Sequence, residues 1–409
     1  MPAENTDGPV GHAAPPPLSG VRVLELGMFI AGPFAGQQLG DLGADVIKVE
    51  HPRGDPMRTW RDFGKGDLWW PSLSRNKRSV TVDMSKREGA DIVRRLAEQS
   101  DILLENFQPG TMENWDLGPD QLLAANPKLV FVRVSGFGQD GPYAQRPGFG
   151  SIGEAMGGVR HTTGWPDRPS TRSGISLGDQ VASLFATVGA LAALRHAEIT
   201  GEGQVVDAAI YESVFAIMES TVAEYELAGH TRPRTGPTLP GVAPSNVYPT
   251  SDGVEVLIAA NSDSIFRRLV GVLDMPELLQ DARFETHFSR GEHQGELDKL
   301  IADRTSELEA QALLEDLNES DVPATLVYTA AEMIADPHFT ARQMITRMHV
   351  EGVGAVPMPA PVPRLSRSPG QIRSSGPRLG EHTDDVLTEF ADLGPEELAT
   401  LRGQGVVGE

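Results

Sequence analysis

Residues 21–50 read VRVLELGMFIAGPFAGQQLGDLGADVIKVE, and this stretch decides the fold. A β-rich run at 21–26 leads into a loop with glycine and proline, then a helical pattern through Leu39, then a second β-rich run at 44–50. Strand, loop, helix and strand in this order are typical of a parallel βαβ unit. We therefore predict an α/β protein built on a parallel sheet.

The acid that ends the second run, Glu50, is compatible with a nicotinamide cofactor site, in which such an acid binds ribose hydroxyls. The first turn, however, lacks the pattern G-x-G-x-x-G. The literal match at 136–141 is followed by Pro142 and Pro147, which prevent a helix from starting there. An NAD-dependent Rossmann enzyme therefore remains an alternative only.

Two more β-rich runs follow at 102–105 and 129–134, with an amphipathic segment at 88–99 before them. Each run ends in a loop rich in glycine and proline. In open α/β sheets, ligands bind beside the carboxyl ends of the strands. We therefore expect these loops to form the ligand site.

The second half of the chain changes character. Residues 208–227 predict one long, largely buried helix, and the Pro/Thr/Gly-rich stretch 231–249 predicts a linker. Strands are expected at 254–259 and 324–328, with two or three helices between them. Residues 230–330 are therefore expected to form a smaller α+β domain.

Residues 48–87 carry ten lysines and arginines, interleaved with Trp60, Trp69 and Trp70. Basic groups beside aromatic faces suit a phosphorylated nucleotide, through charge-assisted hydrogen bonds and stacking. The alternative is a solvated loop whose charges pair with neighbouring acids such as Asp55.

The chain has 409 residues, a net charge of −22 and no cysteine. The acidic balance argues against a nucleic-acid partner and against an anionic membrane surface. The lack of cysteine excludes disulfides, thiolate catalysis and cysteine-ligated zinc. No apolar run is expected to reach the roughly 20 residues that span a bilayer. Residues 1–17 are expected to be a flexible tail rather than a signal peptide, so we expect a cytoplasmic protein.

The stretch 173–180, SGISLGDQ, presents one carboxylate, Asp179, where an apolar helical segment at 181–194 begins. A helix N-terminus favours negative charge, so this carboxylate should stay ionised. An ionised, positioned carboxylate can cap the helix, bind a metal ion, accept a proton or act as a nucleophile. The local sequence leaves these roles open.

Ten short segments appear along the chain in the order typical of one enzyme family. They are 18–26, 31–33, 40–50, 76–79, 105–107, 135–138, 153–158, 178–179, 201–206 and 379–387. No single segment is specific, but the collinear set resembles the family III CoA-transferases, which include formyl-CoA transferase and carnitine CoA-transferase.

The resemblance implies an α/β fold with a Rossmann-like large domain built from both ends of the chain, a smaller α+β domain between them, and an interlocked-ring homodimer. The expected segments are a flexible tail at 1–17, the first part of the large CoA-binding domain at 18–229, the small domain with its linkers at 230–330, and the C-terminal return to the large domain at 331–409.

The resemblance also implies that CoA moves from an acyl-CoA to a free carboxylic acid, with Asp179 as the nucleophile. Its carboxylate would form a mixed anhydride and then an aspartyl-CoA thioester. Coenzyme A and acyl-CoA would be substrates, and neither a tightly bound cofactor nor a metal ion is expected. By position, the family's coenzyme A contacts and neighbouring active-site residues fall on Ile30, Ala31, His51, Trp60, Val82, Asp83, Met84, Ser85, Asn106, Phe107, Gln108 and Phe149.

One departure from the family pattern concerns the phosphates of coenzyme A. Asn114 stands where an arginine is usual, which removes a phosphate partner. Arg53, Arg75 and Arg146 are the candidates to replace it.

Other departures concern the acid substrate. Ile30 replaces a glutamine of formyl-CoA transferase, and Gly150 replaces an acid, although Glu154 follows shortly after. These changes argue against formate or oxalate as substrates. Bulky residues such as Phe149 favour an apolar or larger acid, whereas the run that begins at Arg172 is similar to transferases acting on dicarboxylates such as succinate or malate.

The α-methylacyl-CoA racemases of the same superfamily provide a second alternative. They exchange an α-proton with a histidine and an aspartate, and the position of that histidine reads Phe149 here. Proton abstraction from one face then has no evident base. CoA transfer is therefore the preferred prediction.

Overall fold

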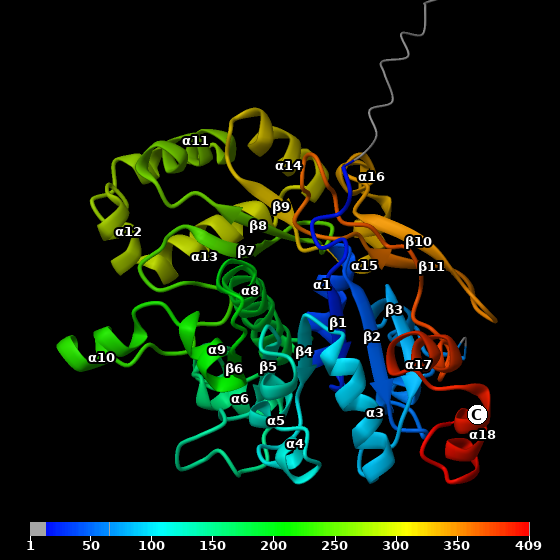
Figure 1. Cartoon of the computed structure of the whole chain (residues 1–409). Coiled ribbons are helices and arrows are strands. Elements are labelled where there is room, and N and C mark those ends of the chain that lie inside the picture. Colours follow the sequence, from blue (N-terminus) through cyan, green and yellow to red (C-terminus); the bar gives the residue numbers. More distant parts are fainter. Residues whose placement is uncertain (1–13, 65, 409) are drawn as a thin grey trace, which may run out of the picture. The chain divides into compact units, whose positions relative to one another are not determined.

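The computed structural model of the chain describes residues 14–64 and 66–408, which form two compact units (Figure 1). Unit 1 comprises the chain up to Val159, Ser173–Ser220 and the chain from Ala341 onward. Unit 2 comprises Arg160–Arg172 and Thr221–Thr340. Residues 1–13 of the expected flexible tail lie outside the described residues.

The smaller unit is larger than the expected small domain and includes residues 160–172. Hydrogen bonds explain this grouping. The N–H of Gly236 donates to the carbonyl oxygen of Gly164 at 2.9 Å, and the guanidinium of Arg234 donates to the carbonyl oxygen of Trp165 at 3.2 Å. Contacts of this kind, between groups far apart in the sequence, cannot be read from composition.

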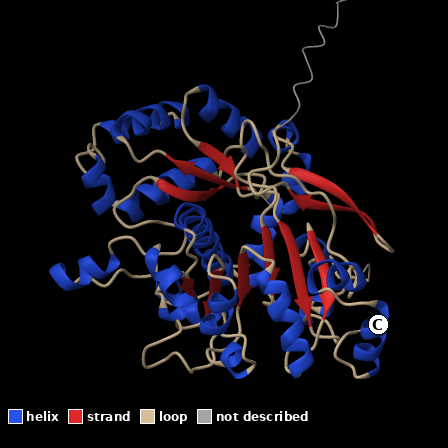
Figure 2. Cartoon of the chain, in the orientation of Figure 1, coloured by secondary structure: helices blue, strands red, loops and turns tan. Residues whose placement is uncertain are grey.

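Six parallel strands form the sheet of unit 1, in the order β3-β2-β1-β4-β5-β6. This is the doubly wound order of dinucleotide-binding folds, and it reverses between β1 and β4. Strands are drawn red in Figure 2 and are labelled in Figure 1. The predicted α/β class with a parallel sheet is confirmed. The strands are β1 (Arg22–Glu25), β2 (Asp45–Glu50), β3 (Lys77–Thr81), β4 (Ile102–Glu105), β5 (Val130–Ser135) and β6 (Val205–Ala209).

The sheet is buried on both faces. Successive side chains of a strand point to opposite faces. Leu24 and Ile47 accordingly belong to one apolar cluster, whereas their neighbours Val23 and Val46 belong to another. Helices therefore cover both faces, as is usual for a parallel sheet.

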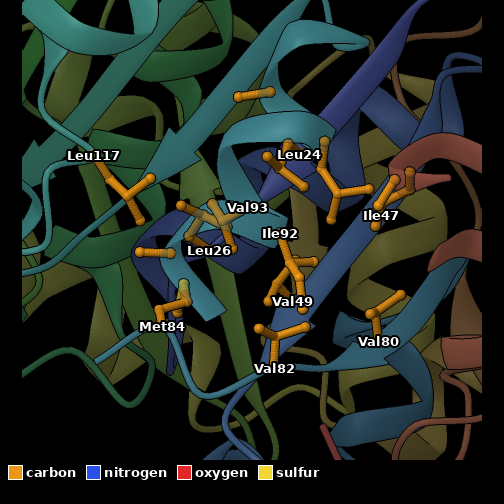
Figure 3. Packing of buried hydrophobic residues seen from close by; sticks show 14 of the residues in the cluster. Leu24, Leu26, Ile47, Val49, Val80, Val82, Met84, Ile92, Val93 and Leu117 are labelled. Carbon is orange, nitrogen blue, oxygen red and sulfur yellow. The ribbon is translucent and has the colours of Figure 1, made fainter. Parts of the chain in front are cut away.

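Figure 3 shows the first of these clusters from close by, with Leu24, Ile47 and Val80 of three neighbouring strands and Ile92 of α3 (Arg87–Glu98). The same cluster contains Val386 of α17 (Thr383–Ala391). The N-terminal and C-terminal parts of the chain thus share one core within unit 1.

The opposite face is covered by α1 (Ala31–Asp41) and α8 (Leu177–Thr200). α8 is long and apolar enough to cross a membrane by length and composition alone, so the expectation that no apolar run reaches that length is wrong. Ala182, Ala186 and Ala190 recur at helical spacing and are fully buried. Packing of this stripe against the sheet accounts for much of the apolar character of α8.

β3 is a strand that the sequence pattern did not predict, because its sequence KRSVT begins with two cations. In the structure Lys77 is buried, and its ammonium lies 2.7 Å from Glu25 Oε2. A buried ion pair therefore stands where an apolar side chain would have signalled a strand.

The prediction of one buried helix over 208–227 is wrong. β6 continues to Ala209 and is followed by two helices, α9 (Ile210–Ala216) and α10 (Thr221–Ala228). Glu219 between them has φ 53°, a left-handed conformation that cannot continue a right-handed helix. α10 contains no buried residue.

Unit 2 contains an antiparallel sheet of β7 (Ser245–Pro249), β8 (Glu255–Ala259) and β9 (Ala324–Leu326). The strands expected at 254–259 and 324–328 are confirmed to within a few residues. β7, however, occupies the end of the expected linker. The helices of this unit are α10, α11 (Asp263–Leu273), η2 (Pro276–Leu279), α12 (His287–Glu292), α13 (Gln294–Thr305), α14 (Ala310–Glu319), α15 (Ala330–Ala335) and α16 (Pro337–Ala341), the last reaching the boundary with unit 1.

The remaining elements are short. They are η1 (Pro56–Thr59), α2 (Trp70–Leu73), α4 (Thr111–Asn114), α5 (Pro119–Ala125), α6 (Gly150–Met156), α7 (Val159–Thr162), the antiparallel strands β10 (Ile345–Val350) and β11 (Gly354–Pro359), and α18 (Pro395–Gly403).

Candidate active site

A cavity of about 610 Å³ opens in unit 1 beside the carboxyl ends of four neighbouring strands. Its wall includes Gly27 after β1, His51 after β2, Val82 after β3 and Phe107 after β4. A doubly wound sheet binds its ligands at this edge, beside the reversal of strand order between β1 and β4. The cavity is therefore the candidate binding site of unit 1.

The structure divides the twelve residues expected around coenzyme A into two groups of six. The first group lines the cavity and consists of His51, Val82, Asp83, Met84, Ser85 and Phe107. The second group does not line it and consists of Ile30, Ala31, Trp60, Asn106, Gln108 and Phe149.

Asn106 holds the cavity wall in place. Its Oδ1 accepts the N–H of Met28 at 2.8 Å, and its Nδ2 donates to the carbonyl oxygen of Met28 at 2.8 Å. Met28 lines the cavity, so Asn106 acts on the cavity through the loop after β1. Gln108 is also bound to backbone, because its side-chain amide donates to the carbonyl oxygen of Gln145 at 3.0 Å.

An aromatic wall is formed by Phe107 and Trp115, whose rings meet edge to face with centroids 5.3 Å apart. The N–H of Phe107 donates to Glu105 Oε2 at 2.7 Å. Burial raises the pKa of Glu105 to about 7, although Arg133 at 2.6 Å opposes the shift. The sequence did not lead us to expect Glu105 or Trp115 at this site. An acid that ends an otherwise apolar strand, as Glu105 does in ILLE, is the feature that could have indicated it.

Polar side chains face one another on the wall after β2 and β3. His51 Nδ1 accepts the N–H of Arg53 at 3.0 Å, and His51 Nε2 lies 3.8 Å from Asp83 Oδ2. Burial would raise the pKa of Asp83, but hydrogen bonds from the hydroxyl and the N–H of Ser85 hold that pKa below its usual value. Asp83 is therefore ionised and fixed in position.

Several cations of the basic segment 48–87 are buried in the fold. The ammonium of Lys48 lies 3.1 Å from Glu25 and 3.0 Å from Asp55, with no side-chain exposure. Burial would lower the pKa of Lys48, but these carboxylates raise it above its usual value. Burial lowers the pKa of Lys77 to about 8, although Lys77 also contacts Glu25. These cations neutralise buried acids, so they are not available to a phosphate.

Of the three arginines proposed to replace the family's arginine, only Arg53 lines the cavity. Arg75 is 2% exposed and its guanidinium pairs with Asp41 at 2.5 Å. Arg146 stacks over the ring of Tyr143 at 3.6 Å. Within the described part of the chain, Arg53 makes no salt bridge. Its guanidinium is therefore the available cation on this wall.

Asp179 is the third residue of α8, in the first helical turn. The N-cap is Ser176, so the structure does not support the reading of Asp179 as the cap. Ser183 Oγ lies 2.7 Å from the carbonyl oxygen of Asp179 and 2.5 Å from that of Ala31. The start of α8 is thereby joined to the start of α1, where Ile30 and Ala31 lie.

Gly150, the first residue of α6, gives the carboxylate of Asp179 its space. A Cβ at Gly150 would lie 2.3 Å from Asp179 Oδ2, closer than any non-bonded contact allows. The position where the family resemblance expects an acid thus faces the nucleophile candidate directly. In this chain the carboxylate itself fills that space.

Three aromatic rings lead from the cavity to this position. Trp60 follows the cavity residue Thr59, and its ring meets Phe29 edge to face at 5.8 Å. Phe29 in turn meets Phe149, the residue before Gly150, at 6.3 Å. Trp60 and Phe149 were expected in the site, and Phe29 connects them. Trp60 and Phe149 are 49% and 67% exposed, so these rings border an open surface in the single chain.

The arrangement presents an acid at a helix N-terminus, beside apolar rings and near a cavity with one available guanidinium. Negative charge is favoured at a helix N-terminus. Residues 14–64 and 66–408 contain no group of three or more His, Asp or Glu that could hold a metal ion. The chemistry that these residues support is nucleophilic attack by a carboxylate or binding of an anionic ligand.

The sequences of known proteins identify the family of the chain. Residues 18–383 match the family model described as CoA-transferase family III. The chain is 54% identical over 396 residues to a succinyl-CoA–D-citramalate CoA-transferase of Chloroflexus aurantiacus. The match covers 96% of this chain and 98% of that relative. The chain is also 39% identical over 399 residues to the alpha subunit of a succinyl-CoA–L-malate CoA-transferase of the same organism. That match covers 96% of this chain and 92% of the relative.

A solved structure gives the same result for the fold. The crystal structure of a CaiB/BaiF family protein from Brucella suis matches with a TM-score of 0.81 and 35% sequence identity, over 92% of this chain and 100% of that one. Because the family model and the relatives extend over nearly the whole described sequence, the chain belongs to family III of the CoA-transferases, enzymes that move CoA from an acyl-CoA to a carboxylic acid.

Proposed function

We propose that this transferase moves CoA from succinyl-CoA to D-citramalate or a closely related dicarboxylic acid. The observation that carries the proposal is the 54% identity to the citramalate enzyme over 96% of the chain. Other relatives are named for transfer to malate, glutarate and mesaconate, which are also dicarboxylates. This supports the dicarboxylate expectation over an apolar acid, and CoA transfer over the racemase and nicotinamide alternatives.

Asp179 starts the proposed reaction. Its carboxylate oxygen attacks the thioester carbonyl carbon of succinyl-CoA, and the C–S bond breaks, which releases CoA thiolate and leaves a mixed anhydride of Asp179 and succinate. The thiolate then attacks the carbonyl carbon of the aspartyl half. This step frees succinate and leaves an aspartyl-CoA thioester on the enzyme.

The acceptor acid completes the exchange by the reverse sequence. Its carboxylate attacks the aspartyl thioester, and CoA thiolate leaves again as a second mixed anhydride forms. The thiolate attacks the acceptor's carbonyl carbon, so acceptor-CoA forms and the carboxylate of Asp179 is restored. Anhydrides hydrolyse, so water must be kept from the reacting carbons while the intermediates exist.

Coenzyme A itself would be held by the cavity at the end of the sheet. Arg53 is the proposed phosphate partner, and the edge-to-face pair of Phe107 and Trp115 offers an apolar surface to the adenine. No tightly bound cofactor is needed for this chemistry. The thioester supplies the energy, and a carboxylate supplies the nucleophile.

We also infer a homodimer in the cytoplasm. Leu184, Phe185 and Val188 of α8 are 44–64% exposed, although α8 is a core helix of unit 1. Contiguous exposed apolar side chains indicate an interaction surface. A second copy of the chain would cover this surface, and an interlocked dimer of the kind expected from the family would do so extensively.

The test is a substrate screen with the purified protein. Succinyl-CoA is mixed with citramalate, malate, mesaconate or glutarate, and new CoA thioesters are identified by mass spectrometry. We expect citramalyl-CoA to form fastest and Asp179→Asn to abolish its formation. If the wild-type protein forms no new thioester with any of these acids, the substrate assignment is wrong.

A further inference from the structure

Glu154 is a buried acid next to the nucleophile candidate, and the mechanism above does not use it. It lies on α6, and its side chain is 1% exposed. Its Oε1 accepts the N–H of Gly178, the residue before Asp179, at 3.2 Å. A buried carboxylate is costly unless it is hydrogen-bonded or paired, so its presence at this point needs a reason.

The hydrogen bond from Gly178 to Glu154 gives an acceptor to a backbone N–H that has none within its own helix. The first N–H groups of a helix have no intrahelical acceptor, and the N-cap Ser176 makes no side-chain capping bond. Glu154 supplies an acceptor for one of these groups from a different helix. Its negative charge is also favourable at the positive end of the α8 dipole.

Two glycines let α6 approach the first turn of α8 closely. A Cβ at Gly178 would lie 2.7 Å from the carbonyl oxygen of Gly150 and 3.1 Å from Cγ of Glu154. A Cβ at Gly150 would lie 2.3 Å from Asp179 Oδ2. The backbone of Gly178 and the carboxylate of Asp179 therefore both contact α6.

We propose that Glu154 is a positioning residue, which fixes the first turn of α8 and thereby aims the carboxylate of Asp179 at the thioester. The inference rests on the proposed function of Asp179 as nucleophile. A nucleophile must be held about 3–3.5 Å from the carbon that it attacks, and a misplacement of about 1 Å can cost about 100-fold in rate. Without the acceptor on α6, the N–H of Gly178 loses its bond, and the turn is held only by its other contacts, such as those of Ser183.

A positioning role depends on how far the side-chain oxygen of residue 154 extends, whereas an electrostatic role depends on the negative charge. Two variants separate these roles. In Glu154→Gln the amide oxygen can still accept the N–H of Gly178, but the charge is gone. In Glu154→Asp the charge remains, but the side chain is one methylene shorter. Positioning therefore predicts that Glu154→Gln retains most of the rate and that Glu154→Asp loses it.

The experiment measures acylation of the enzyme in a single turnover, as release of succinate with formation of the aspartyl-CoA thioester after mixing with succinyl-CoA. We expect Glu154→Ala and Glu154→Asp to slow this step by about 10- to 100-fold, and Glu154→Gln to stay within about fivefold of the wild type. The KM for succinyl-CoA should change little in all three. Glu198→Ala, an exposed acid on the same α8, is the matched control and should behave as the wild type.

Thermal melting and calorimetric titration with coenzyme A show whether each variant is folded and binds. If Glu154→Ala does not fold, the pair of Glu154→Gln and Glu154→Asp decides the question alone. A fast Asp variant with a slow Gln variant, or wild-type acylation in all of them, overturns the positioning role. Asp179→Asn is measured in parallel, and if that variant is active, the proposed nucleophile is wrong whatever the Glu154 variants show.

Discussion

At the scale of single residues, Gly150 and Asp179 compete for one small space. A Cβ at Gly150 would lie 2.3 Å from Asp179 Oδ2, so any larger residue must turn the carboxylate away. We expect Gly150→Ala to lower kcat by about 10-fold or more, because the nucleophile leaves its attack position. Steady-state kinetics with succinyl-CoA and citramalate measure this.

Gly174→Ala is the control for that variant, since a Cβ there meets no atom within 4 Å. It should leave kcat unchanged. An unchanged kcat in Gly150→Ala would show that the carboxylate has another productive position.

Arg53 carries a second prediction at this scale. It is the cavity arginine without a salt bridge in the described chain, so it should bind a phosphate of coenzyme A. We expect Arg53→Ala to raise the KM for succinyl-CoA by about five- to tenfold with little change in kcat, because the variant loses one charged hydrogen bond at an exposed site. Arg146→Ala, which alters an arginine outside the cavity, should not change this KM. The opposite pattern for the two variants would assign the phosphate site to Arg146.

The sequence was most informative where the backbone itself forms the wall. Val82, Asp83, Met84 and Ser85 lie on one segment after a strand, and all four line the cavity. Asn106 could not be placed from sequence, because its side chain binds the backbone of Met28, which is 78 residues away. The roles of such side chains depend on tertiary hydrogen bonds.

At the scale of elements, His382 ties the C-terminal part of the chain to β3. Its Nδ1 accepts the N–H of Ser79 at 3.2 Å, which requires an unprotonated nitrogen. Burial lowers the pKa of His382 below 6.5. The unfolded chain therefore binds a proton before the folded chain does, and stability is lost as the pH falls through 6.5 towards the lowered pKa.

His382→Asn tests this prediction, because an amide oxygen can accept the same N–H but does not titrate. Chemical denaturation between pH 7.5 and pH 5 should show the wild type losing free energy of unfolding relative to the variant as the pH falls. Parallel pH profiles of the two proteins would contradict the assignment.

Element prediction succeeded where the apolar pattern was strong and failed where charge or backbone conformation intervened. β1, β2, β4 and β5 are rich in apolar residues, and all four were found. β3 was missed because Lys77 is buried as an ion pair with Glu25. The helix expected at 208–227 is interrupted at Glu219, whose left-handed backbone leaves no trace in an apolar pattern.

At the scale of the whole molecule, the exposed apolar side chains of α8 predict self-association. Val188 is 64% exposed, and a charge there would oppose burial against a second copy. We expect the wild-type protein to have about twice the chain mass of 43.9 kDa in light scattering. Val188→Glu should shift the mass towards that of one chain or leave the protein insoluble.

Gln99→Glu adds the same charge at an exposed polar position and should remain dimeric. A dimer that persists in Val188→Glu would place the interface elsewhere. The change of composition near residue 230 predicted a domain boundary there, and that boundary stays a prediction. The inclusion of 160–172 in unit 2 was not predictable, because it depends on backbone bonds such as that from Gly236 to Gly164.

The most direct measurement is to trap the covalent intermediate on the enzyme. The protein is incubated with succinyl-CoA, quenched with hydroxylamine, digested and analysed by peptide mass spectrometry. We predict a hydroxamate on Asp179 in the wild type and in no peptide of Asp179→Asn. Steady turnover with no adduct, or with the adduct on another residue, would contradict the account.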